Sequence, residues 1–214
     1  MKSKLLTVFI IMFSSMNFFG QTAKEVAKIG INSTVSVVAL DNYRQPLGYG
    51  SGFILENGLI VTNVHVIKGS KSAYVLMNGS SNKYNVSGYV AIDKANDLVI
   101  LKVEGLIGKS LSLASDELPE MGERIYAIGN PKELSGTFSE GIVSGRREIE
   151  NNEIIQITAP ISPGSSGGPV LNIKSEVVGI AFASYSDGQN LNFAIPVKYL
   201  KKIKTNIGQP QPDR

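Results

Sequence analysis

The sequence predicts an all-β protein, built from two six-stranded antiparallel β-barrels and a C-terminal helix. Short runs rich in β-branched and aromatic residues recur along the 214 residues, and Gly, Asn and Ser separate them. The spacing of apolar residues that is typical of helices is scarce until the end of the chain. The runs form two sets of six. Because each set is too small to bury a large core alone, we expect two small barrels packed side by side.

The two sets of expected strands lie on either side of a connector at 104–122. The expected strands are 34–40, 48–55, 59–62, 73–77, 84–93 and 98–103 in the first set, and 124–129, 137–146, 154–158, 168–171, 177–183 and 192–195 in the second. Barrel one is therefore expected at about 30–104, and barrel two at about 122–196.

The end of the chain predicts one helix. After Pro196, apolar residues recur every three to four positions with lysines between them, at Val197, Leu200, Ile203 and Ile207. This is the pattern of an amphipathic helix. We assign residues 21–208 to one domain and residues 209–214 to a polar tail.

Residues 1–20 have the features of a secretory signal peptide. Two lysines precede an apolar run at 5–13, and a polar break follows it. The run is shorter than the roughly 20 apolar residues of a membrane-spanning helix, so we expect no stable membrane anchor after cleavage. The expected cut follows Gly20 or Ala23. The sequence thus predicts a periplasmic or secreted protein.

Composition excludes several kinds of site. The chain has no Cys and one His, which excludes disulfides, cysteine nucleophiles and zinc sites that need several histidines. A chain exported without disulfides suits a bacterial envelope, whereas glycosylation sequons at Asn32, Asn78 and Asn85 leave eukaryotic secretion as an alternative. Charges are scattered and the formal net charge is +3, so we expect no nucleic-acid partner.

The most informative segment is Ser-Pro-Gly-Ser-Ser-Gly-Gly-Pro at 162–169. A serine flanked by glycines suits a nucleophile, because the backbone has to turn sharply, expose Oγ and direct N–H groups at a developing oxyanion. The pattern Gly-x-Ser-x-Gly around Ser166 also occurs in α/β-hydrolases, in which an acid and then a histidine follow the serine. No histidine follows Ser166, so the order His, Asp, Ser is the one available.

The single histidine and one aspartate stand at the ends of expected strands. His65 follows the strand at 59–62, and Asp97 directly precedes the strand at 98–103. A carboxylate there can accept a hydrogen bond from Nδ1–H of the histidine. Asp93 is the nearest alternative acid. Asp41 would allow the order Asp, His, Ser, although the β-rich pattern argues against the fold that uses it.

These segments resemble the catalytic segments of the trypsin-like superfamily, and specifically of its HtrA/Deg branch. The resemblance covers most of residues 30–200. Its pieces, in order along the chain, are 50–54, 62–66, 96–103, 127–131, 141–144, 163–169 and 192–196. The resemblance implies a serine endopeptidase of chymotrypsin fold. Most HtrA/Deg proteins continue into PDZ domains, and we expect a protease domain without one.

The resemblance also implies a role for each matched residue. Ser166 is expected to attack the scissile carbonyl, His65 to take and return the proton, and Asp97 to orient His65. The N–H groups of Gly164 and Ser166 are expected to form the oxyanion hole. This serine mechanism implies no cofactor, and no metal site is expected.

Specificity is predicted from the same resemblance. Pro160 stands where trypsin-like enzymes place the aspartate that binds Arg or Lys, and Phe182 stands where many of them have Ser or Thr near the catalytic acid. We expect the substrate-binding pocket to be formed by Pro160, Ile161, Ala183, Ser184, Leu191 and Phe193. Burial of an unpaired charge in such an apolar pocket is costly, so we expect cleavage after Val, Ala, Ile or Leu. A deeper pocket would admit Phe or Met.

The sequence therefore predicts a peptidase that acts on exported or misfolded polypeptides. Two alternatives stay open: a protease-like binding module with little activity, and a processing protease with one dedicated substrate. The oligomeric state is left open.

Overall fold

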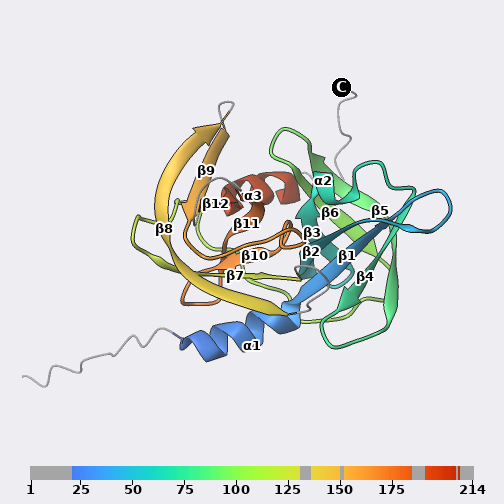
Figure 1. Cartoon of the computed structure of the whole chain (residues 1–214), viewed down its shortest axis with the longest axis horizontal. Coiled ribbons are helices and arrows are strands. Elements are labelled where there is room, and N and C mark those ends of the chain that lie inside the picture. Colours follow the sequence, from blue (N-terminus) through green and yellow to red (C-terminus); the bar gives the residue numbers. More distant parts are fainter. Residues whose placement is uncertain (1–20, 131–135, 150–151, 185–190, 206, 208–214) are drawn as a thin grey trace, which may run out of the picture.

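The computed structural model describes residues 21–130, 136–149, 152–184, 191–205 and 207. It confirms the predicted fold class, because the strands form two closed six-stranded barrels that lie side by side (Figure 1). Barrel one has the strand order β1-β2-β3-β6-β5-β4, and barrel two has the order β10-β11-β12-β9-β8-β7. Neighbouring strands pair antiparallel in both barrels.

The expected strands all occur, with bounds that differ by a few residues at most. Barrel one consists of β1 Thr34–Leu40, β2 Pro46–Glu56, β3 Leu59–Asn63, β4 Ser72–Met77, β5 Lys83–Asp93 and β6 Leu98–Val103. Barrel two consists of β7 Arg124–Gly129, β8 Thr137–Ile149, β9 Asn152–Ile157, β10 Pro169–Leu171, β11 Val177–Ser184 and β12 Asn192–Pro196.

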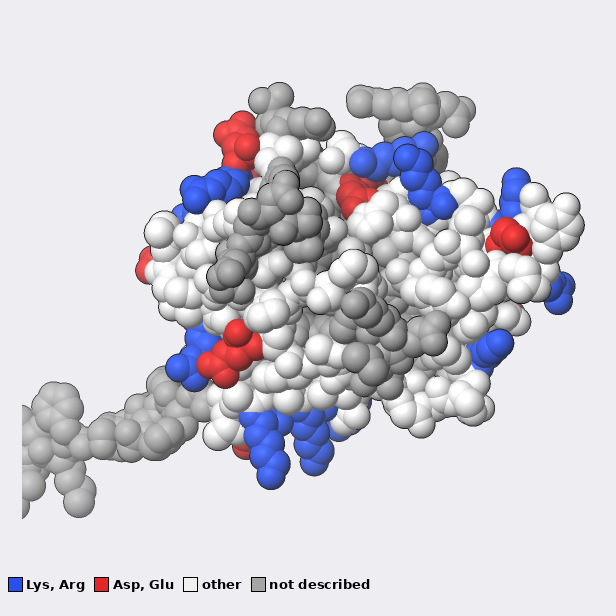
Figure 2. Space-filling view, viewed as in Figure 1, with Lys and Arg blue, Asp and Glu red and all other residues white. Residues whose placement is uncertain are grey.

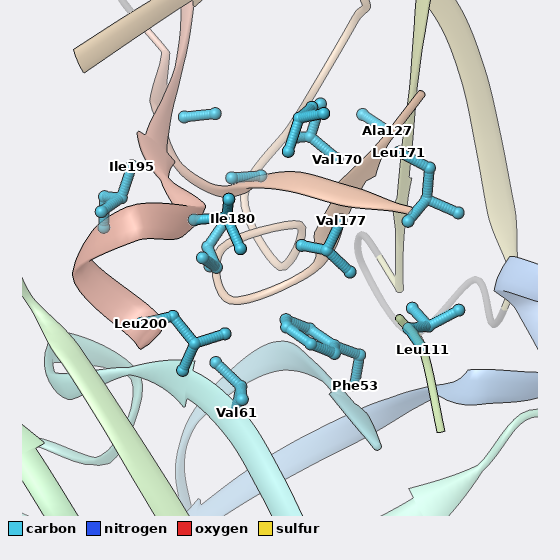
Figure 3. Packing of buried hydrophobic residues seen from close by; sticks show 14 of the residues in the cluster. Phe53, Val61, Leu111, Ala127, Val170, Leu171, Val177, Ile180, Ile195 and Leu200 are labelled. Atoms are coloured by element: carbon cyan, nitrogen blue, oxygen red, sulfur yellow. The ribbon is translucent and has the colours of Figure 1, made fainter. Parts of the chain in front are cut away.

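Strands β2, β3 and β6 of barrel one have apolar residues on both faces, because they lie between the two barrels. In β2, Ile54 packs inside barrel one, whereas Phe53 packs in the core shared with barrel two. In β3, Ile60 and Val61 divide in the same way. Figure 3 shows Phe53 and Val61 facing Val177, Ile180 and Leu200. Such continuous apolar runs are typical of strands that are buried on both faces.

Helix α3 (Val197–Thr205) confirms the predicted C-terminal helix and joins the barrels. Its buried residues Val197, Leu200 and Ile203 belong to the shared core, and it contacts β5 and β6 as well as β11 and β12. Lys204 forms an ion pair with Glu56 of barrel one at 2.6 Å, and Lys198 forms one with Glu153 of barrel two. The helix therefore helps to fix the position of one barrel relative to the other.

Two helices were not expected from the sequence: α1 (Ala23–Ser33) and α2 (Val64–Ile67). A capping box begins α1, since Glu25 N–H donates to Thr22 Oγ1 and Thr22 N–H donates to the Glu25 carboxylate at 2.8 Å. Helix α1 lies along barrel two (Figure 1) and packs closely on it at Gly30, where a Cβ would be 2.0 Å from Cδ1 of Ile128. In the described ranges, no helix is both long and apolar enough to span a membrane.

Charged side chains are dispersed over the molecule. On the face shown in Figure 2, most groups of Lys and Arg lie close to Asp or Glu, and the charged side chains of the described residues lie mainly around the edge. This agrees with the scattered charges of the sequence.

Candidate active site

Strand pairing in barrel one brings His65 and Asp97 together. Strands β3 and β6 pair antiparallel with Asn63 opposite Leu98, so the end of β3 adjoins the start of β6. The chain leaves β3 into helix α2, which carries His65, and Asp97 directly precedes β6. Both residues therefore emerge at the same edge of barrel one.

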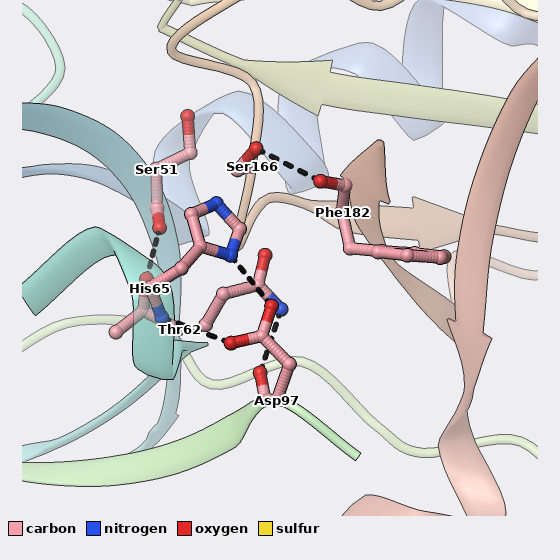
Figure 4. A network of polar contacts seen from close by, with 7 residues as sticks. Ser51, Thr62, His65, Asp97, Ser166 and Phe182 are labelled. Atoms are coloured by element: carbon pink, nitrogen blue, oxygen red, sulfur yellow. Dashed lines mark hydrogen bonds and ion pairs between the residues drawn. The ribbon is translucent and has the colours of Figure 1, made fainter. Parts of the chain in front are cut away.

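The Asp97 carboxylate contacts His65 through both oxygens (Figure 4). Its Oδ2 lies 2.5 Å from Nδ1 of His65, and its Oδ1 accepts a hydrogen bond of 2.9 Å from the His65 backbone N–H. The Asp97 carbonyl accepts from Asn63 Nδ2 at 2.9 Å and from Val64 N–H at 3.2 Å. Asp97 has a φ of 52°, a left-handed conformation that Asp tolerates better than most residues. These contacts fix the histidine ring with Nδ1 towards Asp97.

Neither alternative acid contacts His65 in the part of the chain that the structure describes. The Asp93 carboxylate accepts from Asn96 N–H at 3.0 Å and from Asn96 Nδ2 at 2.7 Å, within the turn between β5 and β6. Oδ1 of Asp41 accepts from Tyr43 N–H and Gln45 N–H at 2.8 Å each, in the hairpin between β1 and β2. Both carboxylates stabilise turns.

Barrel two contributes Ser166, on the loop between β9 and β10. Gly167 N–H donates to Ala181 O at 2.8 Å, which anchors this loop to β11. Gly167 has a φ of +86°, and a Cβ there would lie 2.1 Å from Ser51 O and 2.3 Å from Thr62 Oγ1. The loop therefore needs glycine at this position, both for its backbone conformation and for its close approach to barrel one.

The Ser166 hydroxyl does not bond His65. Its Oγ donates to the carbonyl oxygen of Phe182 in β11 at 3.2 Å (Figure 4). The other ring nitrogen of His65, Nε2, lies on the side of Ser166 and has no hydrogen bond to any described residue. The site thus brings the three predicted residues together, with the serine hydroxyl turned towards β11.

The backbone N–H groups of the Ser166 loop differ in whether the described residues provide an acceptor for them. The N–H groups of Ser165, Gly167 and Gly168 donate to backbone carbonyls within 3.0 Å. In contrast, those of Gly164 and Ser166 have no acceptor among the described residues. Gly164 has a φ of +99°, which favours glycine. A pair of free N–H groups next to a serine hydroxyl is an arrangement that suits an anionic oxygen.

The residues predicted to bind substrate come from β11, from the start of β12 and from the loop that follows β9. Phe193 is 6% exposed and its ring centroid lies 6.4 Å from that of Phe182, whereas Leu191 is 37% exposed. Ile161 is half-buried and Pro160 is exposed. The backbones of Ala183 and Ser184 pair in β11 with Phe193 and Asn192. The side chains of Ala183 and Ser184 lie outside what the structure describes, as do residues 185–190.

Phe182 lies near Asp97, as its place in the resemblance predicted. Both residues line a cavity of about 180 Å³, together with the apolar side chains of Ile149, Ile154 and Ile195. No Ser or Thr hydroxyl bonds the Asp97 carboxylate in the described ranges, so His65 provides the hydrogen bonds to it.

Two buried polar residues next to the Ser166 loop, Asn192 and Ser51, had no role predicted from the sequence. Asn192 is 5% exposed and donates from Nδ2 to Ala159 O at 2.9 Å, which ties β12 to the start of the loop. Ser51 is fully buried and contacts the loop from barrel one. Both residues lie in segments that carry the resemblance, and a polar residue inside an apolar strand is the signal that could have found them.

Comparison with known proteins shows the family to which the chain belongs. The family of trypsin-like peptidase domains matches residues 50–180. The chain is 38% identical over 170 residues to "Putative serine protease HhoB" of Synechocystis. The alignment covers 75% of this chain and 40% of the relative. It is also 38% identical over 172 residues to "Probable periplasmic serine endoprotease DegP-like" of Rhizobium meliloti. This alignment covers 76% of this chain and 34% of the relative.

A solved structure supports the fold as well. The serine endoprotease from Yersinia pestis superposes with a TM-score of 0.77 at 27% identity, over 87% of this chain and 66% of that one. The region matched by this chain makes up less than half the length of each of the two sequence relatives, from Synechocystis and from Rhizobium meliloti. The predicted resemblance to HtrA/Deg proteases is confirmed: the chain belongs to the family of trypsin-like peptidase domains, and its relatives include DegP-like serine proteases.

Proposed function

We propose that the protein is a serine endopeptidase in which His65, Asp97 and Ser166 form the catalytic triad. His65 Nε2 takes the proton of Ser166 Oγ while Oγ bonds to the carbonyl carbon of the scissile peptide. The peptide C–N bond then breaks, and the imidazolium gives its proton to the leaving amine. Water hydrolyses the acyl ester by the same route, which restores Ser166 and His65.

The contact between His65 and Asp97 is the observation that carries this proposal. With Asp97 Oδ2 2.5 Å from Nδ1, the proton of a neutral ring belongs on Nδ1, and Nε2 is left as the acceptor. The second bond, from the His65 backbone to Oδ1, keeps the carboxylate from rotating away. The Asp97 charge also stabilises the imidazolium that forms during the reaction.

The free N–H groups of Gly164 and Ser166 support the same mechanism. As Oγ attacks, the carbonyl oxygen gains negative charge, and donors that are already fixed stabilise it without further reorganisation. Loss of one such donor typically lowers kcat by about 100- to 1,000-fold. Gly164 would thus act through its backbone alone.

The Ser166 hydroxyl has to leave Phe182 before it can react. Rotation about the Cα–Cβ bond moves Oγ between staggered positions, one of which faces Phe182 O in the structure. Substrate backbone placed along β11 would compete for that carbonyl. We expect this competition to release the hydroxyl to His65.

We also propose which side chain precedes the cleaved bond, which polypeptides are substrates and where the protein acts. The apolar surroundings of Phe182, Phe193 and Ile161 favour an aliphatic side chain before the cleaved bond. Exported or misfolded polypeptides are the expected substrates. Residues 1–20 and the periplasmic name of the Rhizobium relative support export to the periplasm or secretion.

The experiment compares Ser166→Ala with Ser162→Ala, an exposed serine of the same loop. Hydrolysis of fluorescein-labelled casein should fall by more than about 1,000-fold in Ser166→Ala and stay near normal in Ser162→Ala. His65→Ala should be inactive as well. Near-normal turnover by Ser166→Ala would reject the triad.

A protease-like binding module with little activity is the second candidate. The bond of Ser166 Oγ to Phe182 O, in place of His65, is the observation that favours it. Casein that binds to the unaltered protein without being cut would establish this candidate. A processing protease with one dedicated substrate would leave casein intact yet still react covalently with a fluorophosphonate at Ser166.

A further inference from the structure

Ser51 belongs to β2 of barrel one, yet it forms two hydrogen bonds with the Ser166 loop of barrel two. We propose that Ser51 is a positioning residue that holds the two backbone donors of the oxyanion hole in place. This inference rests on the proposed function. It concerns a residue that does not itself touch the reacting atoms.

The backbone of Ser51 holds the carbonyl of the nucleophile. Ser51 N–H donates to Ser166 O at 2.8 Å. The carbonyl of Ser51 accepts from Thr62 Oγ1 at 2.7 Å, and this bond ties the same residue to β3. The position from which Ser51 binds the loop is therefore set by the sheet of barrel one.

The hydroxyl of Ser51 holds the carbonyl of Gly164. Its Oγ donates to Gly164 O at 2.7 Å and accepts from Asn130 N–H at 2.8 Å. A hydroxyl has a single proton, and an amide N–H can only donate, so the Ser51 proton is committed to Gly164 O. The Ser51 side chain is fully buried and Gly164 is half-buried, so the loss of this hydroxyl costs bonds that bulk water replaces poorly.

The two carbonyls that Ser51 binds belong to the residues that carry the free N–H groups. Gly164 is bound through its carbonyl by the hydroxyl, and Ser166 through its carbonyl by the backbone N–H of Ser51. Gly164 has no side chain to restrict it and a φ of +99°. Without the Ser51 hydroxyl, the 164–165 peptide is held only by the bond from Ser165 N–H to Ser162 O. The adjoining peptide, which carries the Gly164 N–H, is then held less firmly in its direction.

Ser51→Ala should therefore lower the rate of reaction more than the binding of substrate. We expect kcat to fall by roughly 10- to 100-fold with KM changed by less than about threefold, because the lost orientation matters mainly in the transition state. A peptide aldehyde that ends in valinal forms a hemiacetal with Ser166 Oγ and places its oxygen between the two N–H groups. Its affinity should fall in parallel with kcat.

Thr34→Val is the matched control. This variant also removes a fully buried hydroxyl of barrel one. The Thr34 hydroxyl donates to the carbonyl of Gly30 in α1 at 2.8 Å, and this bond does not involve the Ser166 loop. This variant should lose stability but keep its kcat and its affinity for the aldehyde. Ser51→Thr, which keeps a hydroxyl, should recover part of kcat. If Ser51→Ala does not fold, Ser51→Cys, with a weak donor of similar size, is measured in the same way.

The outcomes separate this inference from the proposed function. If the unaltered protein cleaves casein and Ser51→Ala or Ser51→Cys matches Thr34→Val in kcat and aldehyde affinity, Ser51 is merely structural and this inference falls alone. If the unaltered protein neither cleaves casein nor binds the aldehyde, both proposals fall. A selective loss of kcat and aldehyde affinity in the Ser51 variants supports the positioning role.

Discussion

Substitution of Gly167 by Ala tests how closely the two barrels approach at the Ser166 loop. A Cβ at residue 167 would lie 2.1 Å from Ser51 O and 2.3 Å from Thr62 Oγ1, and the first of these atoms is backbone. The left-handed conformation, with φ at +86°, costs a residue with a side chain about 1–2 kcal/mol. Overpacking adds about 1–3 kcal/mol. We expect Gly167→Ala to lower the free energy of unfolding by about 2–5 kcal/mol.

Gly122→Ala separates the two contributions. Gly122 has a φ of +88°, and a Cβ added there would have no other atom within 4 Å, so this variant bears the conformational cost alone. We expect a loss of about 1–2 kcal/mol and normal activity. Because both changes restrict the unfolded chain equally, the difference between the variants isolates the contact with barrel one.

Urea unfolding followed by far-UV circular dichroism measures both variants, since the chain has no Trp for fluorescence. Casein hydrolysis, measured in parallel, should be lost only in Gly167→Ala, because the side chain pushes Ser166 away from barrel one. Equal losses of stability in the two variants would refute the close approach. Normal activity of Gly167→Ala would show that the loop has room to move.

The remaining predictions concern α1 and specificity. The bond from the Thr22 backbone lowers the pKa of Glu25 below its ordinary value of 4.5, so the carboxylate stabilises α1 at neutral pH and loses this effect as the pH falls through the folded pKa. The unaltered protein should therefore have a higher free energy of unfolding than Glu25→Gln at neutral pH, and urea unfolding should show that this difference disappears in acid. A difference that does not depend on pH would contradict the capping role. Asn78→Ala removes the 2.8 Å bond from Nδ2 to Ile31 O and should cost about 1 kcal/mol, and no change in the urea midpoint would show that the bond contributes nothing. Mass spectrometry of a denatured protein mixture after digestion should find Val, Ala, Ile or Leu before most cuts, and dominant cutting after Arg, Lys or Glu would show the pocket to be wrongly assigned.

The barrels could be predicted from the sequence because their signals are local. Continuous apolar runs such as Phe53 to Leu55 and Leu98 to Leu101 follow from strands buried on both faces, and turn residues separate them. Helix α1 was missed because Gly30 and the β-branched Ile29 and Ile31 weaken its helical signal just before the first strand. The capping box of Thr22 and Glu25 was the available signal.

The family resemblance predicted individual site residues, whereas the residue pattern by itself predicted only a serine, a histidine and more than one candidate acid. That Asp97 and not Asp93 reaches His65 depends on the register of β3 with β6, in which Asn63 lies opposite Leu98. No local pattern fixes that register. The direction of the Ser166 hydroxyl and the bonds of Ser51 depend on contacts between barrels, which are distant in sequence and leave no periodic trace.

Covalent labelling with a fluorophosphonate, followed by peptide mass spectrometry, tests the triad most directly. The reagent reacts with a serine hydroxyl only where a base removes its proton and donors stabilise the charged oxygen. We predict a single adduct on Ser166, with labelling abolished in His65→Ala and strongly reduced in Asp97→Ala. An adduct on another residue, or equal labelling of Ser166 in His65→Ala, would contradict it.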